Sequence, residues 1–289
     1  MKQLVFLINK RSGVDRIKAL SGSIEKLLDK TQYTYEIYDT EYEKHGTELA
    51  RKAALQGAYG VIAVGGDGSV NDVVNGLKGS TTLLGILPKG SGNGMARSLN
   101  IPLSVEKAIA VINKNKIAEI DVAYANEHAF ISNAGVGFDA LIIDQFRHSA
   151  RRGFASYCTL ITRSIFSYKD PEWRILVDGK EYKQKAFFIN IANGKQLGYD
   201  FVIAANADYT DGLLEVTIVG KFPKLMGAWL ALRMRRNTLH KSKYVRTMQA
   251  KEVIVEAPHL TRLQTDGDPH SANGKVYFRI EGKQKIFVP

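Results

Sequence analysis

The sequence has one cysteine and no long hydrophobic run. Because Cys158 has no second cysteine to pair with, an internal disulfide is excluded, and this cysteine usage fits a reducing compartment. No apolar run reaches the roughly 18 residues that a membrane-spanning helix needs. The N-terminal apolar run, Leu4–Ile8, is shorter than the core of a signal peptide. We therefore expect a cytoplasmic protein without an export signal or a membrane span.

Negative charge is outnumbered by positive charge, most strongly in the second half of the chain. Of the formal net charge of +11, residues 1–122 carry +3 and residues 123–289 carry +8. Positive charge that collects in one part predicts an anionic surface partner, and composition alone leaves both a membrane and a nucleic acid open. The length of 289 residues suits two domains, each large enough to bury its own core.

A glycine-rich turn, Gly65–Gly68, follows the apolar run Val61–Val64 and precedes a stretch with helical spacing. Glycines let the backbone approach an anion, and the first amides of a helix point toward it, so the turn predicts a phosphate site. Asp67 within it would repel phosphate unless it holds a cation or accepts a proton from an attacking hydroxyl. The alternative is that Asp67 only caps the helix.

Strand and helix patterns alternate through residues 1–122. This order predicts a Rossmann-like parallel sheet with right-handed crossovers. In such sheets ligands bind at the carboxyl ends of the strands. The turns Asn9–Gly13, Thr40 and Gly65–Gly68 all fall at such ends, so we expect them to converge on one crevice.

A second glycine-rich turn follows the apolar run Leu83–Leu87. Residues 88–99 hold three glycines and Ser91 ahead of a helical pattern, which predicts a second anion-binding turn. Lys89 and Arg97 could neutralise phosphate there, or they could be ordinary solvated cations.

Near residue 122 this alternation gives way to closely spaced short strands, which are typical of a β-sandwich. The expected strands cover residues 118–124, 128–132, 173–177, 186–192, 213–219 and 252–257. We therefore expect an α/β domain over residues 1–122 and a β-rich domain over residues 123–289. Residues 280–289 could rejoin the first domain.

Two basic, apolar helical stretches interrupt these strands. Gln145–Lys169 contains five Lys/Arg and no acid, and Lys221–Arg246 contains eight and again no acid. Six apolar residues of the second stretch are expected on one helix face: Phe222, Leu225, Met226, Trp229, Leu230 and Leu232. Such helices lie on anionic membranes, or they close a sandwich and expose their cations to solvent. Both interpretations can hold together.

Two acidic turns stand out in the second half. Asp208 and Asp211 lie in an Asp-Gly turn before a strand, and most such turns bind nothing. Asp266 and Asp268 flank Gly267, and two carboxylates so placed can divide the polarisation of a hydroxyl and the binding of Mg²⁺ between them.

These segments resemble, in order, the motifs of the diacylglycerol kinase and sphingosine kinase family within the NAD kinase-like superfamily. Gly65–Gly68 resembles its GGDG nucleotide loop, and residues 88–99 resemble its G-T/S-x-N-D-F/L-A-R motif. Two departures, Gly94 in place of the usual Asp and Ser91 in place of Thr, are closer to the GSGNA-type loop of sphingosine kinases.

The resemblance continues through the second half. Asn133–Ala140 is similar to the family's N-x-x-x-G-x-D-A segment, and Asp208–Val216 to a loop that binds a structural Mg²⁺. The family usually has D-G-E where this chain has Asp266–Asp268, adjoining the nucleotide cleft.

The resemblance implies an ATP-dependent lipid kinase with ATP and Mg²⁺ as cofactors, a Rossmann-like α/β domain and a C-terminal β-sandwich. It assigns the nucleotide to Asn9, Ser12, Gly13, Thr40, Gly65, Gly66, Asp67, Gly68, Ser69, Asn71, Gly90, Ser91, Gly92 and Asn93. It assigns catalysis to Asp67, Asp266 and Asp268, with Asp67 or Asp266 accepting the proton of the lipid hydroxyl. It assigns the structural metal to Asp208, Asp211 and Leu213.

The expected partner is a lipid substrate at an anionic membrane surface, to which the enzyme binds peripherally, and no nucleic acid is expected. The acceptor stays open among diacylglycerols, sphingoid bases and isoprenoid or glycolipid alcohols, and the oligomeric state, a homodimer included, stays open too. Two alternatives remain: a kinase of a soluble substrate similar to NAD kinase, and a non-catalytic relative that binds lipid, nucleotide or nucleic acid.

Overall fold

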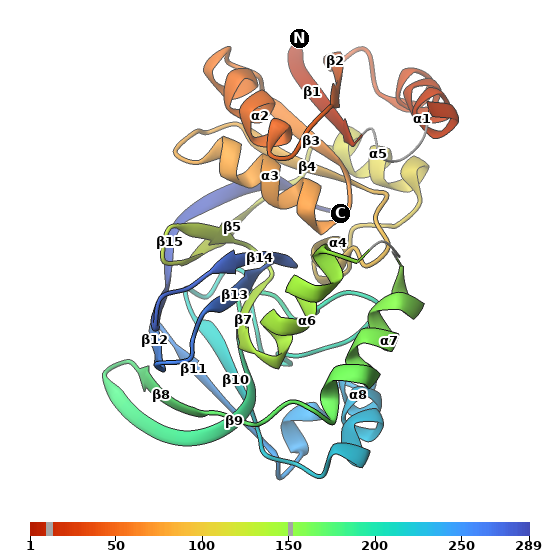
Figure 1. The fold of residues 1–289 in the computed structure, drawn as a ribbon. Coiled ribbons are helices and arrows are strands. Elements are labelled where there is room, and N and C mark those ends of the chain that lie inside the picture. Colours follow the sequence, from red (N-terminus) through yellow and green to blue (C-terminus); the bar gives the residue numbers. More distant parts are fainter. Residues whose placement is uncertain (10–13, 150–152) are drawn as a thin grey trace. The chain divides into compact units, whose positions relative to one another are not determined.

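The computed structural model describes residues 1–9, 14–149 and 153–289, which form two compact units (Figure 1). The first unit contains Met1–Ile120 and Gly282–Pro289, and the second contains Asp121–Glu281. Strands β5 (Ile117–Ala125) and β15 (Lys275–Phe287) each have residues in both units.

The first unit is built on a parallel sheet in the order β2-β1-β3-β4. Its strands are β1 (Lys2–Asn9), β2 (Tyr33–Thr40), β3 (Gly60–Gly65) and β4 (Leu83–Pro88). Ile286 of β15 pairs in parallel with Leu84 and extends the sheet. Every residue of β3 and β4 is buried, as expected for parallel strands that are covered on both faces.

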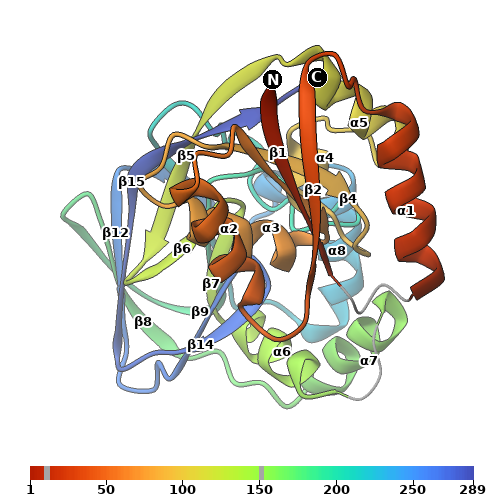
Figure 2. The same cartoon turned by 90° about the horizontal axis from the view of Figure 1, so that it is seen from above.

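Helices cover both faces of this sheet. They are α1 (Val14–Leu27), α2 (His45–Leu55), α3 (Asp67–Leu77), α4 (Gly94–Ser98) and α5 (Val105–Lys114). Helix α1 packs against α5, and α2 packs against α3. Figure 2 shows α1 and α2 on opposite sides of β1 and β2. The first unit therefore has the predicted Rossmann-like arrangement.

The second unit is an antiparallel β-sandwich, also as predicted. Its remaining strands are β6 (His128–Phe130), β7 (Asn133–Gly137), β8 (Glu172–Val177), β9 (Lys180–Ala192), β10 (Leu214–Gly220), β11 (Val245–Ala250), β12 (Glu252–Glu256), β13 (Arg262–Thr265) and β14 (Asp268–Ser271). One layer has the order β14-β13-β7-β9-β10-β11, and the other has β9-β8-β12-β15. Strand β9 belongs to both layers, because its first half pairs with β8 and its second half with β7 and β10.

Two hydrophobic cores stabilise this unit. Trp173, Ile189 and Phe278 are among the residues that fill the space between the layers. Outside the sandwich, α6 (Phe138–Arg147), α7 (Phe154–Ile165) and α8 (Gly227–Arg235) bury a second cluster that includes Phe187 and Phe222. Two 3-10 turns, η2 (Lys224–Met226) and η3 (Leu239–Lys241), flank α8. No helix among the described residues is long and apolar enough to cross a bilayer.

The prediction of a single apolar face for residues 222–232 is wrong. Phe222 and Leu230 are buried in the second cluster, whereas Leu225, Trp229 and Leu232 are exposed. Since α8 is only nine residues long and packs with one face, the apolar residues of its other face cannot reach the same core.

A glycine in α3 tests the packing of the first unit. A Cβ added to Gly76 would lie 2.5 Å from the Thr47 carbonyl oxygen and 2.6 Å from the Ala50 Cβ, so Gly76→Ala forces α2 away from α3. We expect it to lower the free energy of unfolding by about 1–3 kcal/mol in urea titrations.

The control is Gly22→Ala in α1, where the added Cβ meets nothing within 4 Å. Removal of this helical glycine should raise the free energy of unfolding by roughly 0.5–1 kcal/mol. Equal effects of the two substitutions would contradict this packing.

Candidate active site

The two glycine-rich turns of the first unit touch through their backbones. The Lys89 amide at the end of β4 donates a 2.8 Å hydrogen bond to the Gly65 carbonyl at the end of β3. A Cβ added to Gly90 would lie 2.3 Å from the Gly66 Cα, and one added to Gly66 would lie 3.0 Å from the Gly90 Cα. Because backbone cannot move aside as a flexible side chain can, Gly90 must be glycine, and Gly66 has little room for a side chain.

The Asp67 carboxylate binds the N-terminus of α4 and does not cap its own helix, whose N-cap residue is Gly66. Its Oδ2 accepts from the Gly94 amide at 3.0 Å and its Oδ1 from the Met95 amide at 3.1 Å. Burial raises the pKa of Asp67, and the amide bonds and Arg97 lower it only in part. Asp67 is therefore a desolvated carboxylate that ties the two turns together.

Asn93 closes the second turn from a left-handed backbone conformation with φ 49°. The Gly90 amide donates to Asn93 Oδ1 at 3.0 Å, and Asn93 Nδ2 donates to the Gly90 carbonyl at 2.8 Å. Arg97 Nε donates to the Gly92 carbonyl at 3.1 Å. The Asn93 amide thus holds the shape of the turn, while Ser91 is exposed.

The carboxyl ends of the parallel strands bring other predicted residues together. The register places Asn9 of β1 opposite Thr40 of β2. A Cβ at Gly65 would lie 2.3 Å from Ser69 Oγ and 3.9 Å from the Asn9 Cβ, so both side chains lie against the first turn, which Gly68 continues into α3. Two predicted nucleotide-binding residues lie outside the described residues: Ser12 and Gly13.

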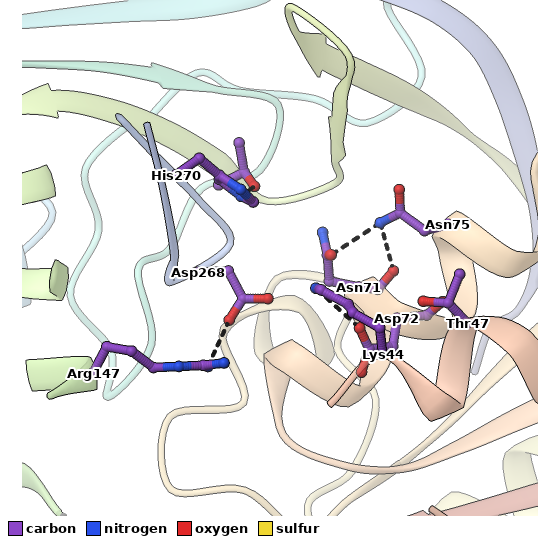
Figure 3. A network of polar contacts seen from close by, with 9 residues as sticks. Lys44, Thr47, Asn71, Asp72, Asn75, Arg147, Asp268 and His270 are labelled. Atoms are coloured by element: carbon purple, nitrogen blue, oxygen red, sulfur yellow. Dashed lines mark hydrogen bonds and ion pairs between the residues drawn. The ribbon is translucent and has the colours of Figure 1, made fainter. Parts of the chain in front are cut away.

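Asn71 is buried in the second turn of α3, where Asn75 Nδ2 donates to its carbonyl oxygen at 2.9 Å and to its Oδ1 at 3.0 Å (Figure 3). The next residue, Asp72, pairs with Lys44 Nζ at 3.1 Å and accepts a bond from Thr47 at its carbonyl (Figure 3). Sequence reasoning missed Lys44 and Asp72, because a lysine before a helix is not distinguishable in sequence from a solvated one.

In the second unit, Asp266 and Gly267 form the two-residue turn between β13 and β14. Both have positive φ, 49° and 85°, as the turn type of tight hairpins requires. The Asp266 carboxylate accepts hydrogen bonds from the amides of Ile131 and Ser132 at 2.8 Å and from that of Asn133 at 3.0 Å. These three amide bonds make Asp266 the residue that fixes the start of β7 to the hairpin.

Asp268 begins β14 and has a different environment. Its Oδ1 lies 3.5 Å from Arg147 Nη1 at the end of α6 (Figure 3). Two residues further, His270 Nε2 lies 2.8 Å from Thr265 Oγ1, and its ring stacks on that of His128 with 3.8 Å between centroids. Asp268 is thus a predicted catalytic carboxylate that lies beside a guanidinium.

Four polar side chains beside this hairpin form what we call the Asp139 network: Asn133, Asp139, Asn190 and Gln264. Gln264 Nε2 donates to Asp139 Oδ2 at 2.9 Å and to Asn133 Oδ1 at 3.0 Å. Asn190 Nδ2 also donates to Asn133 Oδ1, at 3.2 Å. Gln264 Oε1 accepts from the Gly267 amide at 3.0 Å, so the network reaches the turn between Asp266 and Asp268.

The Asp139 carboxylate occupies space that Gly135 leaves open, since a Cβ on Gly135 would lie 2.1 Å from Asp139 Oδ2. Burial raises the pKa of Asp139, and the bonds from Gln264 and Asn190 lower it only in part. Sequence reasoning placed Asn133–Ala140 near the site by resemblance but missed Gln264 and Asn190. Gln264 and Asn190 could have been found in the sequence as side-chain amides at inward-facing positions of otherwise apolar strands.

The predicted metal loop consists of turns closed by its own carboxylates. Asp208 Oδ1 accepts from the Thr210 amide at 2.9 Å, Asp211 Oδ1 from the Leu213 amide at 2.9 Å, and the buried Asp121 from the Gly212 amide at 2.8 Å. Within residues 1–9, 14–149 and 153–289, no group of three His, Cys, Asp or Glu could hold a metal. One exposed carboxylate with nearby carbonyls is nonetheless the oxygen donor set that suits Mg²⁺.

A buried carboxylate adjoins this loop. Glu215 accepts from the Asn206 amide at 2.8 Å through Oε2, while its Oε1 has no hydrogen-bond partner in the described part of the chain. Burial raises the pKa of Glu215, and the charge of Asp211 raises it further. A cation at the loop would relieve this unfavourable charge, so the residues fit the predicted ion.

Comparisons with known proteins cover both units. A family model described as the diacylglycerol kinase catalytic domain matches residues 3–125, and one described as the YegS C-terminal NAD kinase beta sandwich-like domain matches residues 132–281. A protein of Chromohalobacter salexigens named "Probable lipid kinase YegS-like" is 31% identical over 78% of this chain and 74% of its own length. A Cronobacter sakazakii protein of the same name is 29% identical over 95% and 91%.

Solved structures share the fold over the whole chain. A crystal structure of a diacylglycerol kinase from Bacillus anthracis superposes with a TM-score of 0.76 at 20% identity, covering 100% of this chain and 97% of that one. At this identity the likeness concerns the fold.

The Asp139 network predicts a pH-dependent stability effect. Gln264→Leu removes the donor to a buried carboxylate and should lower the free energy of unfolding by about 1.5–3 kcal/mol at pH 8. The pKa of Asp139 in the folded state is already raised, and the substitution raises it further. As pH falls through these raised values the carboxyl is protonated in the folded state, so the loss should shrink at pH 5.

Urea titrations at both pH values measure this effect. Gln249→Leu is the matched control, since its carboxylate partner Asp211 is exposed, and it should change stability by less than about 0.5 kcal/mol at either pH. A loss for Gln264→Leu that is the same at pH 5 and pH 8 would show that Asp139 is not its cause.

Proposed function

The chain belongs to the diacylglycerol kinase catalytic domain family and is a lipid kinase, and from this premise we propose that it transfers the γ-phosphate of ATP to the hydroxyl of a membrane lipid. The observation that carries the proposal is the contact of the two glycine turns, Gly65–Gly68 and Gly90–Asn93, with Asp67 bonded across them. Phosphoryl transfer depends on positioning and charge stabilisation more than on covalent chemistry of the protein, and such turns supply both.

The turns of the first unit bind the nucleotide phosphates in this proposal. Gly66 carries no side chain that could cap α3, so the first amides of this helix can donate to phosphate oxygens. The helix dipole favours negative charge at the same place. Ser91 would donate a further hydrogen bond to the phosphates. Lys89 before the second turn and Arg97 in α4 would add positive charge beside them.

The three carboxylates have separate roles. Asp67 accepts two amide hydrogen bonds and Asp266 three, and in this proposal each carboxylate holds the shape of its own turn. We assign proton acceptance to Asp268, whose partner is the guanidinium of Arg147. The oxygen of the lipid hydroxyl forms a bond to the γ-phosphorus of ATP, and the bond between that phosphorus and the ADP oxygen breaks. The proton of the same hydroxyl passes to the Asp268 carboxylate.

Mg²⁺ has two proposed places. With the nucleotide, it would neutralise the β- and γ-phosphates, and Asp67 is the carboxylate of the two turns that could hold it. In the second unit, Asp211 with carbonyl oxygens of Asp208 and Leu213 would hold a structural ion that stabilises the loop before β10.

The lipid acceptor is reached at an anionic membrane surface. Within the second unit, residues 153–169 hold two Lys/Arg and no acid, and residues 221–246 hold eight Lys/Arg and no acid. This supports peripheral association with anionic lipid in preference to a soluble substrate.

Transfer of labelled phosphate from γ-labelled ATP tests the reaction, with diacylglycerols, sphingoid bases and isoprenoid alcohols each presented in anionic vesicles with Mg²⁺. Asp268→Asn should lower kcat by about 10²–10⁴ with little change in KM for ATP, because it removes the proton acceptor. Asp178→Asn, in the Asp-Gly turn between β8 and β9, is the control and should retain activity. ATP binding without label in any lipid would refute the proposed reaction, and near-normal turnover of Asp268→Asn would refute the role of Asp268.

The contact between the turns predicts a second, separate effect. Gly90→Ala places a Cβ 2.3 Å from the Gly66 Cα and should push the phosphate-binding turns apart. We expect the Kd for ATP to rise about tenfold or more, while the protein stays folded by circular dichroism. Gly22→Ala, far from any contact, should leave the Kd unchanged. Unaltered ATP affinity of Gly90→Ala would exclude these turns as the phosphate site.

A further inference from the structure

Helix α8 presents two apolar faces, and only one of them is covered. Leu230 of α8 and Phe222 before it are buried in the second core of the sandwich unit, with Met226 and Met234 packed against them. Leu225 lies in the 3-10 turn η2 that leads into α8, and Trp229 and Leu232 lie in α8. Their sequence spacing of i, i+4, i+7 is that of side chains that share one side of a continuous helical segment. Their side chains are 86%, 39% and 43% exposed. We call these three residues the α8 stripe.

The exposure of the α8 stripe is imposed by how the segment is held. Lys224 Nζ forms a 2.6 Å ion pair with Asp170 and lies 4.1 Å from the centre of the Phe187 ring. Gly227 lets α8 approach α7, because a Cβ there would lie 2.7 Å from Ile165 Cδ1. With both Lys224 and Gly227 fixed to the body of the unit, Leu225 between them is directed outward and does not belong to a frayed end.

Further aromatic surface continues from α7, which Figure 1 shows beside α8. Phe166, directly after Ile165, is 61% exposed. At the other end of α7, Phe154 is also exposed and packs on Tyr199 with 4.7 Å between ring centroids. Exposed apolar residues thus come from two neighbouring elements of one unit, and exposed apolar surface of this kind marks interaction sites.

The surroundings of the α8 stripe are strongly basic. Residues 221–246 include eight Lys/Arg and no Asp or Glu. Six of these cations are exposed: Lys221, Arg235, Arg236, Lys241, Lys243 and Arg246. The Arg233 guanidinium lies 4.5 Å from the centre of the Trp229 ring, so the tryptophan has a cation on its face. Apolar side chains with a tryptophan, rimmed by cations, match the boundary between anionic headgroups and acyl chains.

Charge also argues against a second copy of this chain as the occupant. A two-fold symmetric interface places the same patch of both copies face to face. It would set the cations of one 221–246 segment against those of the other without an acid from either segment. An anionic bilayer has the complementary charge.

We propose that the α8 stripe is the segment by which the enzyme inserts into the headgroup layer of an anionic membrane, with the cations of residues 221–246 contacting lipid phosphates. This inference rests on the proposed function in one respect: it takes the acceptor to be a lipid that resides in the membrane.

Trp229 is a built-in probe of the insertion, because the sequence has only one other tryptophan, the buried Trp173. In a Trp173→Phe background, which needs a check of folding by circular dichroism, all tryptophan emission comes from Trp229. Vesicles with a third anionic phosphatidylglycerol should shift this emission to the blue, and purely zwitterionic phosphatidylcholine vesicles should not. Where Trp173→Phe fails to fold, quenching of the native protein by brominated lipids reports the same insertion, since Trp173 is 2% exposed.

Substitutions separate the apolar and the charged contributions. Leu225→Ser and Leu232→Ser should each weaken binding to anionic vesicles by about tenfold. Leu55→Ser is the matched control, since Leu55 on α2 is 83% exposed and should be neutral. Arg235→Gln and Arg236→Gln should each cost about fivefold at low salt and less at high salt.

A second assay format distinguishes failure of this inference from failure of the proposed function. In detergent micelles that present the acceptor as dispersed molecules, Leu225→Ser and Leu232→Ser should match the parent, whereas on vesicles they should be slower. The insertion would be overturned if the protein binds vesicles without a change in Trp229 emission. It would also be overturned if Leu225→Ser binds vesicles with the same affinity as the parent. Both outcomes leave the kinase reaction intact. If the emission of Trp229 shifts on addition of a protein but not on addition of any vesicle, the insertion is overturned in favour of a protein partner. Absence of phosphate transfer in both formats would instead refute the proposed reaction, and the vesicle binding would still decide the insertion.

Discussion

The first unit depends on a backbone contact that tolerates no side chain. Gly66 and Gly90 come from turns that are separated by a whole strand and helix, and they meet so closely that a Cβ on Gly90 would collide with the Gly66 Cα. The Asp67 carboxylate secures the contact, since it begins in one turn and accepts both amides at the start of the helix that follows the other. The helix α4 has only five residues and could not order itself by its own hydrogen bonds, so the carboxylate that caps it also determines where the second turn lies. These contacts hold the two glycine-rich turns together and leave their backbone without covering side chains.

In the second unit, buried polar groups hold the hairpin between β13 and β14 in place. Asp266 receives three amides, and Gln264 joins the hairpin turn to the buried Asp139. A buried carboxylate is unfavourable unless its hydrogen bonds are made, so each member of the network constrains the others.

The sandwich unit combines this rigid hairpin with a surface of another character. Its helices bury one apolar face against β9 and β10, and α8 keeps a second apolar face outside, among cations. If the acceptor lies in a membrane, as we propose, this uncovered apolar face would be the part of the unit that contacts it. The same short helix can close a core and leave apolar side chains exposed because its residues divide between the two faces.

Much of this molecule could be read from the sequence. Hydrophobic runs, glycine turns and their order predicted the parallel sheet, the sandwich and the strand ends where Asn9, Thr40 and Gly65 gather, because local periodicity and strand direction decide these features. The family resemblance predicted the acidic turns. Tertiary structure alone decided which partner each polar group finds: that Asp67 caps α4 and not α3, that Asp266 holds three amides, that Gln264 reaches Asp139, and that Leu225, Trp229 and Leu232 face outward. These outcomes rest on contacts between residues far apart in the chain, and a side chain's spacing in sequence carries no record of the distant group that packing will bring beside it.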